Sequence, residues 1–92
     1  MLGMGILALR ADERVESVSS TADSLVVSLK DGRTFSVPLP WYPRLFEAKA
    51  SARKRWKISG GGYGIHWPEL DEDLSTEGLL RGAPAPQRPV KA

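Results

Sequence analysis

The 92-residue chain is long enough for one domain with a modest apolar core, and its 41% hydrophobic and 26% charged residues argue against wholesale disorder and a membrane-embedded protein. The absence of cysteine excludes disulfides, thiolate metal sites and a cysteine nucleophile, and it favours a reducing, cytoplasmic location. Thirteen basic and eleven acidic side chains leave a net charge of +2, which permits nucleic-acid binding but hardly indicates it.

The first segment, residues 1–12, contains a short apolar run. This run is too short to span a bilayer, and no basic region precedes it as in a signal peptide. We interpret the segment as a leader that is either flexible or a first strand.

Residues 15–37 predict a three-stranded antiparallel meander. In its middle strand Leu25, Val27 and Leu29 alternate with more polar neighbours, as expected for a strand with one buried face. Asp31-Gly32 follows directly, and this dipeptide is typical of a tight two-residue hairpin turn. We expect a weaker first strand over 15–20.

A helix is expected after the meander, because the two prolines at 38 and 40 cannot donate hydrogen bonds to a sheet. Pro43 is tolerated in a first helical turn. Four apolar residues then recur at helical spacing and predict one buried helix face. These residues are Leu45, Ala48, Ala52 and Trp56.

The next residues predict a second short hairpin, with strands over 55–59 and 64–67 joined by a turn at the three consecutive glycines. An acidic loop is expected over 69–73. Asp73 or Ser75 can then cap a short helix that runs through Leu80 and stops at Gly82.

These elements predict a two-layer α+β domain over residues 13–82, in the order β-β-β-α-β-β-α. Residues 83–92 read APAPQRPVKA, a proline-rich basic stretch with nothing to bury. We expect this stretch to be a disordered tail.

Four segments carry a likeness to known proteins: the DGR turn, PLPWYPRLFEA, the strand ending RWKI and above all GGGYGIHWPELDEDLSTEGLLRG. In these segments the chain resembles a bacterial family, the domain of unknown function 2442. The resemblance implies a small intracellular two-layer domain with no established enzymatic activity. Similar proteins are also proposed, on circumstantial grounds, to be antitoxin partners of a small toxin-like protein, so the resemblance implies this role as well. Some relatives carry a helix-turn-helix module after this domain, for which the ten residues after Gly82 are too few.

The single histidine, His66, is followed by four carboxylates at 69, 71, 72 and 73. A general base or metal site needs partners at suitable positions, and the acidic spacing does not match a calcium loop. We favour a hydrogen bond from His66 to the acidic loop or to the backbone, with the acids supporting the helix that follows. The glycine run lacks the ending of a phosphate-binding loop. We therefore predict no catalytic residue, metal or cofactor.

A basic run beside Trp56 suggests a second surface, because cations neutralise phosphates and aromatic rings stack on bases. A solvated charged face around a core tryptophan is the simpler interpretation. The candidate nucleic-acid contacts are Arg53, Lys54, Arg55 and Lys57.

The aromatic content is high for so small a core, and aromatic side chains often anchor interfaces. Together with an open sheet edge, this favours a protein partner or a homodimer. The candidate interaction surface comprises Trp41, Tyr42, Tyr63, His66, Trp67, Glu69, Asp71 and Asp73.

The leading hypothesis is therefore a non-enzymatic protein-interaction module, either antitoxin-like or a regulatory partner of a small bacterial protein. The alternative is a nucleic-acid-binding accessory domain that uses the basic run. A third hypothesis, a small enzyme built on His66, lacks a credible nucleophile and orienting group. Neither a membrane nor a small-molecule substrate is expected as a partner.

Overall fold

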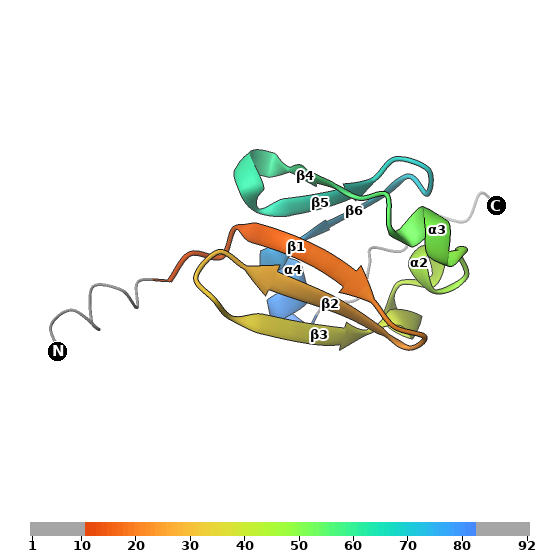
Figure 1. Ribbon diagram of the computed structural model, residues 1–92, viewed down its shortest axis with the longest axis horizontal. Helices are drawn as coiled ribbons and strands as arrows, with labels where there is room; N and C mark the ends of the chain where they lie inside the picture. The colour runs from red at the N-terminus through yellow and green to blue at the C-terminus, as the bar shows by residue number, and fades with distance from the viewer. Residues whose placement is uncertain (1–10, 83–92) are drawn as a thin grey trace, which may run out of the picture.

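The computed structural model describes residues 11–82 (Figure 1). The α+β class and the predicted order of strands and helices are confirmed, with two three-stranded antiparallel sheets. The predicted disordered tail and most of the predicted leader lie outside the described residues. The elements are β1 (Val15–Ser20), β2 (Ser24–Leu29), β3 (Thr34–Pro38), η1 (Leu39–Trp41), α2 (Pro43–Phe46), α3 (Ala50–Arg53), β4 (Lys57–Ser59), η2 (Gly60–Gly62), β5 (Gly64–Trp67), β6 (Glu72–Ser75) and α4 (Thr76–Arg81).

The first sheet has the order β1-β2-β3 and forms the predicted meander. Leu25, Val27 and Leu29 are buried, whereas the residues between them are only half-buried. The pairing of Val27 with Val18 on β1 and the burial of both side chains show that the strands share one apolar face. The alternation in the sequence therefore identified the face that packs into the core.

The hairpin between β2 and β3 differs in detail from the predicted two-residue turn. The Leu29 N–H donates to the Arg33 carbonyl at 2.8 Å, so the loop contains three residues. Of these, only Gly32 has a positive φ, at 97°, which matches a type I turn followed by a left-handed glycine. Asp31 keeps the negative φ that is usual for an L-residue, and its carboxylate accepts hydrogen bonds from the Arg33 N–H at 3.0 Å and from the Asp12 N–H at 2.9 Å.

The predicted single helix is wrong, because the chain forms two one-turn helices instead. Lys49 separates α2 from α3 with an extended conformation, φ −68° and ψ 151°. Leu45 is buried as predicted, but Trp56 lies beyond the end of α3 and is only half-buried. The Arg53 guanidinium donates to the carbonyls of Leu45 at 3.1 Å and Ala48 at 2.7 Å. A side chain thus satisfies acceptors that a continuous helix would have used internally.

The second sheet has the order β4-β5-β6, and its third strand occupies part of the predicted acidic loop. Along β6, Glu72 and Leu74 are buried whereas Asp73 and Ser75 are exposed. This is the alternation of a half-buried strand, but an acid occupies one inward position and hides the pattern in the sequence. The turn before β6 needs Asp71 at a φ of 51°, the one positive φ outside glycine among the described residues.

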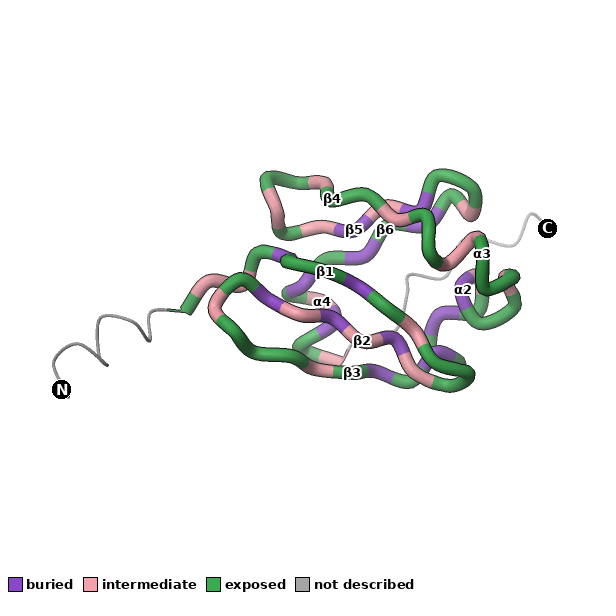
Figure 2. The backbone as a smooth tube through the Cα atoms, in the orientation of Figure 1, coloured by how far each residue is buried: buried purple, intermediate pink, exposed green. Residues whose placement is uncertain are grey.

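One core joins the two sheets. Ile65, Trp67 and Leu74 of the second sheet belong to the same buried cluster as the inward side chains of the first sheet. Figure 2 shows these buried segments in the middle of β2, β5 and β6, with exposed residues in the surrounding turns. α4 lies behind the first sheet in Figure 1 and adds Leu79 to the core.

The C-terminal helix α4 has both of its predicted ends. The Ser75 hydroxyl accepts a hydrogen bond from the Gly78 N–H at 3.0 Å, which makes Ser75, and not Asp73, the N-cap. Gly82 ends the helix in the left-handed conformation with φ 83°. No helix within residues 11–82 is long and apolar enough to cross a membrane.

The stability of the fold should decrease in acid through Asp31 and Asp12. Hydrogen bonds from Arg33, and then from the Asp12 N–H, hold the pKa of Asp31 well below its ordinary value. Hydrogen bonds from Arg14 lower the pKa of Asp12 to about 2. Because both pKa values are lower in the folded chain than in the unfolded chain, both carboxylates stabilise the fold above the unfolded pKa of 3.8, and this stabilisation is lost as the pH falls below it.

The variant Asp31→Asn tests this. We expect a lower melting temperature at pH 7 and a smaller further decrease between pH values of about 5 and 3 than in the wild type, measured by circular dichroism. Asp23→Asn is the matched control, because Asp23 lies in the other hairpin turn and forms no ion pair with a described residue. An equal acid-induced decrease in wild type and Asp31→Asn would contradict the assignment.

Candidate protein-binding groove

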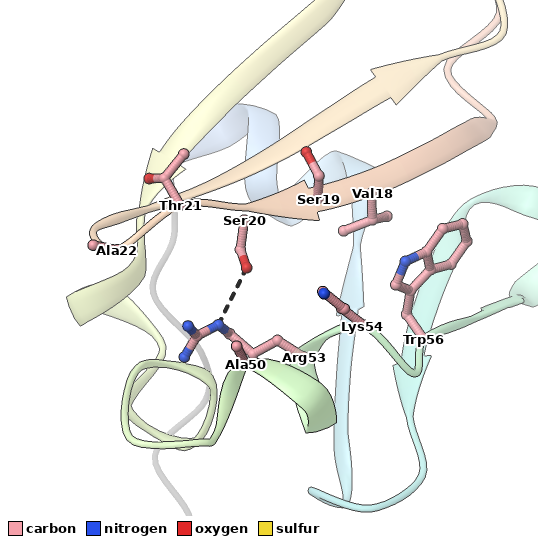
Figure 3. Close-up of a pocket in the computed structure, with 9 residues that line it drawn as sticks. All are labelled: Val18, Ser19, Ser20, Thr21, Ala22, Ala50, Arg53, Lys54 and Trp56. Atoms are coloured by element: carbon pink, nitrogen blue, oxygen red, sulfur yellow. Dashed lines mark hydrogen bonds between the residues drawn. The ribbon is translucent and has the colours of Figure 1, made fainter.

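A groove of about 450 Å³ separates the outer edge of β1 from α3 and the segment that follows α3 (Figure 3). One wall is formed by the end of β1 and the turn after it, from Val18 to Ala22. The opposite wall is formed by Ala50, Arg53, Lys54 and Trp56. This volume lies within the range of about 300–1,000 Å³ that is common for ligand sites.

The β1 wall is an unpaired sheet edge. β1 hydrogen-bonds only β2 in its sheet, and the Thr21 N–H closes the hairpin by donating to the Ser24 carbonyl at 2.9 Å. Since alternate residues of an antiparallel strand face the partner strand, Ser19 faces Val26 and the backbone groups of Val18 and Ser20 face outward. Beyond the strand ladders, no backbone hydrogen bond between described residues involves Val18 or Ser20. These groups are free to pair with another chain.

Arg53 fixes the geometry of the opposite wall. Its Nε donates to the Ser20 hydroxyl at 3.2 Å, the bond drawn in Figure 3, in addition to the two bonds from its Nη1 to carbonyls of the α2 region. Its own carbonyl accepts a hydrogen bond from the Trp67 Nε1 at 3.1 Å. Arg53 therefore makes three side-chain hydrogen bonds within the protein, through Nε and Nη1, and a contact of Arg53 with nucleic acid stays a prediction.

The rest of the basic run does not form one continuous cationic surface. Arg55 pairs with Glu69 at 2.6 Å, and Lys57 lies on β4 directly opposite His66. Lys54 projects into the groove, and none of the ion pairs between described residues involves it. Lys54 is thus the member of the run whose charge is both exposed and available in the groove.

The predicted aromatic and acidic surface is not one surface either. Tyr42 and Trp67 are 1% and 0% exposed, so both are core residues, and placing them on an interaction surface is corrected. Trp41 and Tyr63 are 42% and 50% exposed. Figure 1 places their segments, around η1 and η2, at opposite ends of the domain.

The burial of Tyr42 is linked to that of Glu72, which is only 5% exposed. Burial raises the pKa of the Tyr42 phenol, and the negative charge of Glu72 raises it further. The sequence analysis placed Tyr42 on an interaction surface and Glu72 in a loop. In the structure both are buried, Tyr42 as the N-cap residue of α2 and Glu72 on β6, so each places a polar group in the core.

His66 forms the predicted hydrogen bond with the acidic segment. Its Nδ1 lies 2.8 Å from an oxygen of Asp73, which is its direct partner across β5 and β6. Among the described residues, no serine or threonine hydroxyl is hydrogen-bonded to His66, and no group of three potential ligands is arranged to hold a metal. Two other acids have cationic neighbours, with Glu69 bound to Arg55 and Asp71 lying 3.7 Å from Arg44.

A family model described as "Protein of unknown function (DUF2442)" matches residues 15–85. The chain belongs to this family. A solved structure of a protein of unknown function from Rhodospirillum rubrum is 30% identical, with a TM-score of 0.71 over 84% of this chain and 95% of that chain. An uncharacterized protein from Chromobacterium violaceum shares the fold at 23% identity, with a TM-score of 0.69 over 86% of this chain and 79% of that chain. No curated protein matches.

Membership of this family confirms the resemblance seen in the sequence. The residues that line the groove lie mainly outside the segments on which that resemblance was based. Its β1 wall, from Val18 to Ala22, joins the end of the predicted first strand to the turn after it. The signal in the sequence was a serine-rich strand end followed, about thirty residues later, by the basic run. Only the fold brings the two together.

The role of Arg53 can be tested by comparing it with its neighbour. Arg53→Ala removes three side-chain hydrogen bonds and should lower the free energy of unfolding by about 1–3 kcal/mol. Lys54→Ala removes an exposed side chain and should change it by less than about 0.5 kcal/mol. Urea unfolding followed by tryptophan fluorescence measures both. Equal stabilities for the two variants would show that Arg53 is a surface residue after all.

Proposed function

We propose that this protein is a non-enzymatic, cytoplasmic protein-interaction module that binds a partner protein in the groove between β1 and α3. The observation that carries the proposal is the unpaired edge of β1 next to a groove. An exposed strand edge is a template for pairing with another chain, and strand addition is a common way to recognise a protein segment.

The groove walls support the proposal because they are held in place before a partner arrives. The bond from Arg53 to the Ser20 hydroxyl ties the helical wall to the strand wall. The bond from Trp67 to the Arg53 carbonyl ties the same wall to the second sheet. A preformed site loses less conformational entropy on binding than a flexible one.

A more specific form of the proposal is that the module is an antitoxin-like or regulatory partner of a small bacterial protein. It rests on the resemblance that the sequence shows to its family. Co-expression with the products of neighbouring genes tests this form, since an antitoxin-like partner should restore growth to a host that makes a toxic neighbour. A growth defect that persists despite a stable complex would leave a regulatory partner as the better description.

The alternative of nucleic-acid binding is weaker than the sequence suggested. Of its four predicted contacts, Arg53 donates to groups inside the protein and Arg55 pairs with Glu69. Counterion release on nucleic acid grows with the number of cations that reach phosphates, and Lys54 and Lys57 supply two. Nucleic acid that co-purifies with the protein and is lost from Lys54→Ala/Lys57→Ala would favour this alternative.

Photo-crosslinking from the two edges of the first sheet tests the interaction proposal. A photoreactive amino acid at Ser19, beside the groove, should form an adduct with one protein when the chain is expressed with its neighbouring genes. The same amino acid at Ser36, an exposed position on β3, is the matched control. The proposal would be overturned if the two positions gave the same adducts or if Ser19 gave none.

A further inference from the structure

We infer that the groove takes an extended acidic segment of the partner, which adds to the edge of β1 as a fourth strand. This inference rests on the proposed function and goes beyond it by stating the conformation and the charge of what is bound. Three features of the groove carry it, namely the backbone groups of β1, the charges of the opposite wall and the Trp56 ring.

The conformation follows from β1. Outward backbone groups at Val18 and Ser20 recur every second residue, which is the spacing at which a neighbouring extended strand places its own donors and acceptors. A helix satisfies its backbone groups internally and has none to offer to such an edge. An extended segment therefore fits the β1 wall better than a helix.

The charge follows from the opposite wall. The charged side chains that line the groove are Arg53 and Lys54, both cationic, and no acid lines it. The hydrogen bonds of Arg53 run to two carbonyls and a hydroxyl, so no carboxylate bonded to it cancels its charge. A carboxylate in the bound segment would meet Lys54, whose side chain lines the groove. Charge complementarity of this kind selects partners more than it adds affinity.

Trp56 supplies the apolar contact. Its ring is half-buried and lies beside Val18 in the groove (Figure 3). In an extended segment, side chains alternate between two faces, so an apolar residue that faces Trp56 and an acid that faces Lys54, on the same wall, stand two positions apart. The segment that fits best carries acidic and apolar side chains in turn along one face, at every second position.

The occupant comes from another protein. Residues 1–10 and 83–92 contain no aspartate or glutamate, so neither end of this chain carries the complementary charge. A second copy that paired β1 with β1 around a twofold axis would bring the cationic side chains of both grooves toward each other. Like charges at such a contact disfavour it.

Synthetic peptides test the inference on the full-length protein. The probe is a nine-residue peptide, Glu-Thr-Val-Thr-Glu-Thr-Val-Thr-Glu, in which glutamate and valine take turns along one face, and the control is the same peptide with lysine in place of glutamate. We expect the acidic peptide to shift the amide resonances of residues 18–22 and 54–56 and to bind about tenfold more tightly than the basic one at low salt. Lys54→Glu should abolish that preference, because the new carboxylate offsets the charge of Arg53, and Lys57→Glu, outside the groove, should not.

A third peptide, with every backbone amide N-methylated, separates strand pairing from simple charge attraction. It keeps the carboxylates but cannot donate to β1, so it should bind much more weakly and should not protect the Val18 and Ser20 amides from hydrogen exchange. Three results would overturn the inference: equal binding of acidic and basic peptides, resonance shifts confined to other surfaces, or shifts at β1 that depend on protein concentration without peptide. The last would identify a second copy as the occupant.

A negative result in the peptide experiment and a negative result in the crosslinking experiment have different meanings. A partner crosslinked from Ser19 together with no binding of the acidic peptide would preserve the proposed function and remove only the assigned chemistry. Peptide binding that behaves as expected, without any crosslinked protein, would preserve the chemistry of the groove and remove the assignment of a protein partner among the neighbouring gene products.

Discussion

The Arg53 guanidinium links parts of the chain that no single secondary-structure element connects. The guanidinium donates to carbonyls of the α2 region and to a hydroxyl of β1. The backbone carbonyl of Arg53 accepts a hydrogen bond from the indole N–H of Trp67 in β5. The helical segment is too short to be stable alone, because helices of one turn gain few internal hydrogen bonds. Its position therefore depends on these contacts, and the groove between α3 and β1 depends on that position.

The two sheets meet over a core in which most inward positions are aliphatic or aromatic, with Glu72 and Thr76 as the buried polar exceptions. Burying a carboxylate is costly unless nearby groups compensate. Its placement beside Tyr42 joins β6 to the N-terminal end of α2, again linking the second sheet to the helical segment. Polar contacts at this junction position the elements, whereas apolar burial supplies most of the stability.

The same arrangement explains the distribution of charge. Within residues 11–82, most cations and anions with exposed side chains are paired locally, as in Arg14 with Asp12 or Arg55 with Glu69, and isolated surface pairs of this kind contribute little stability. Lys54 differs because it faces a groove whose other charged side chain is also cationic. A protein with a net charge of only +2 can in this way present a locally cationic strand edge.

Local patterns in the sequence determined the meander, the glycine-containing turns, the capped last helix and the hydrogen bond of His66 to the acidic segment, because each depends on residues close together in the chain. The tertiary structure alone decided the break between α2 and α3, the third strand at Glu72 and the burial of Tyr42. Each of these depends on contacts between different elements, such as the bonds from Arg53 to the carbonyls of Leu45 and Ala48, and periodicity carries no information about such partners. The groove belongs to the second group, since its two walls lie about thirty residues apart and meet only when both sheets share one core.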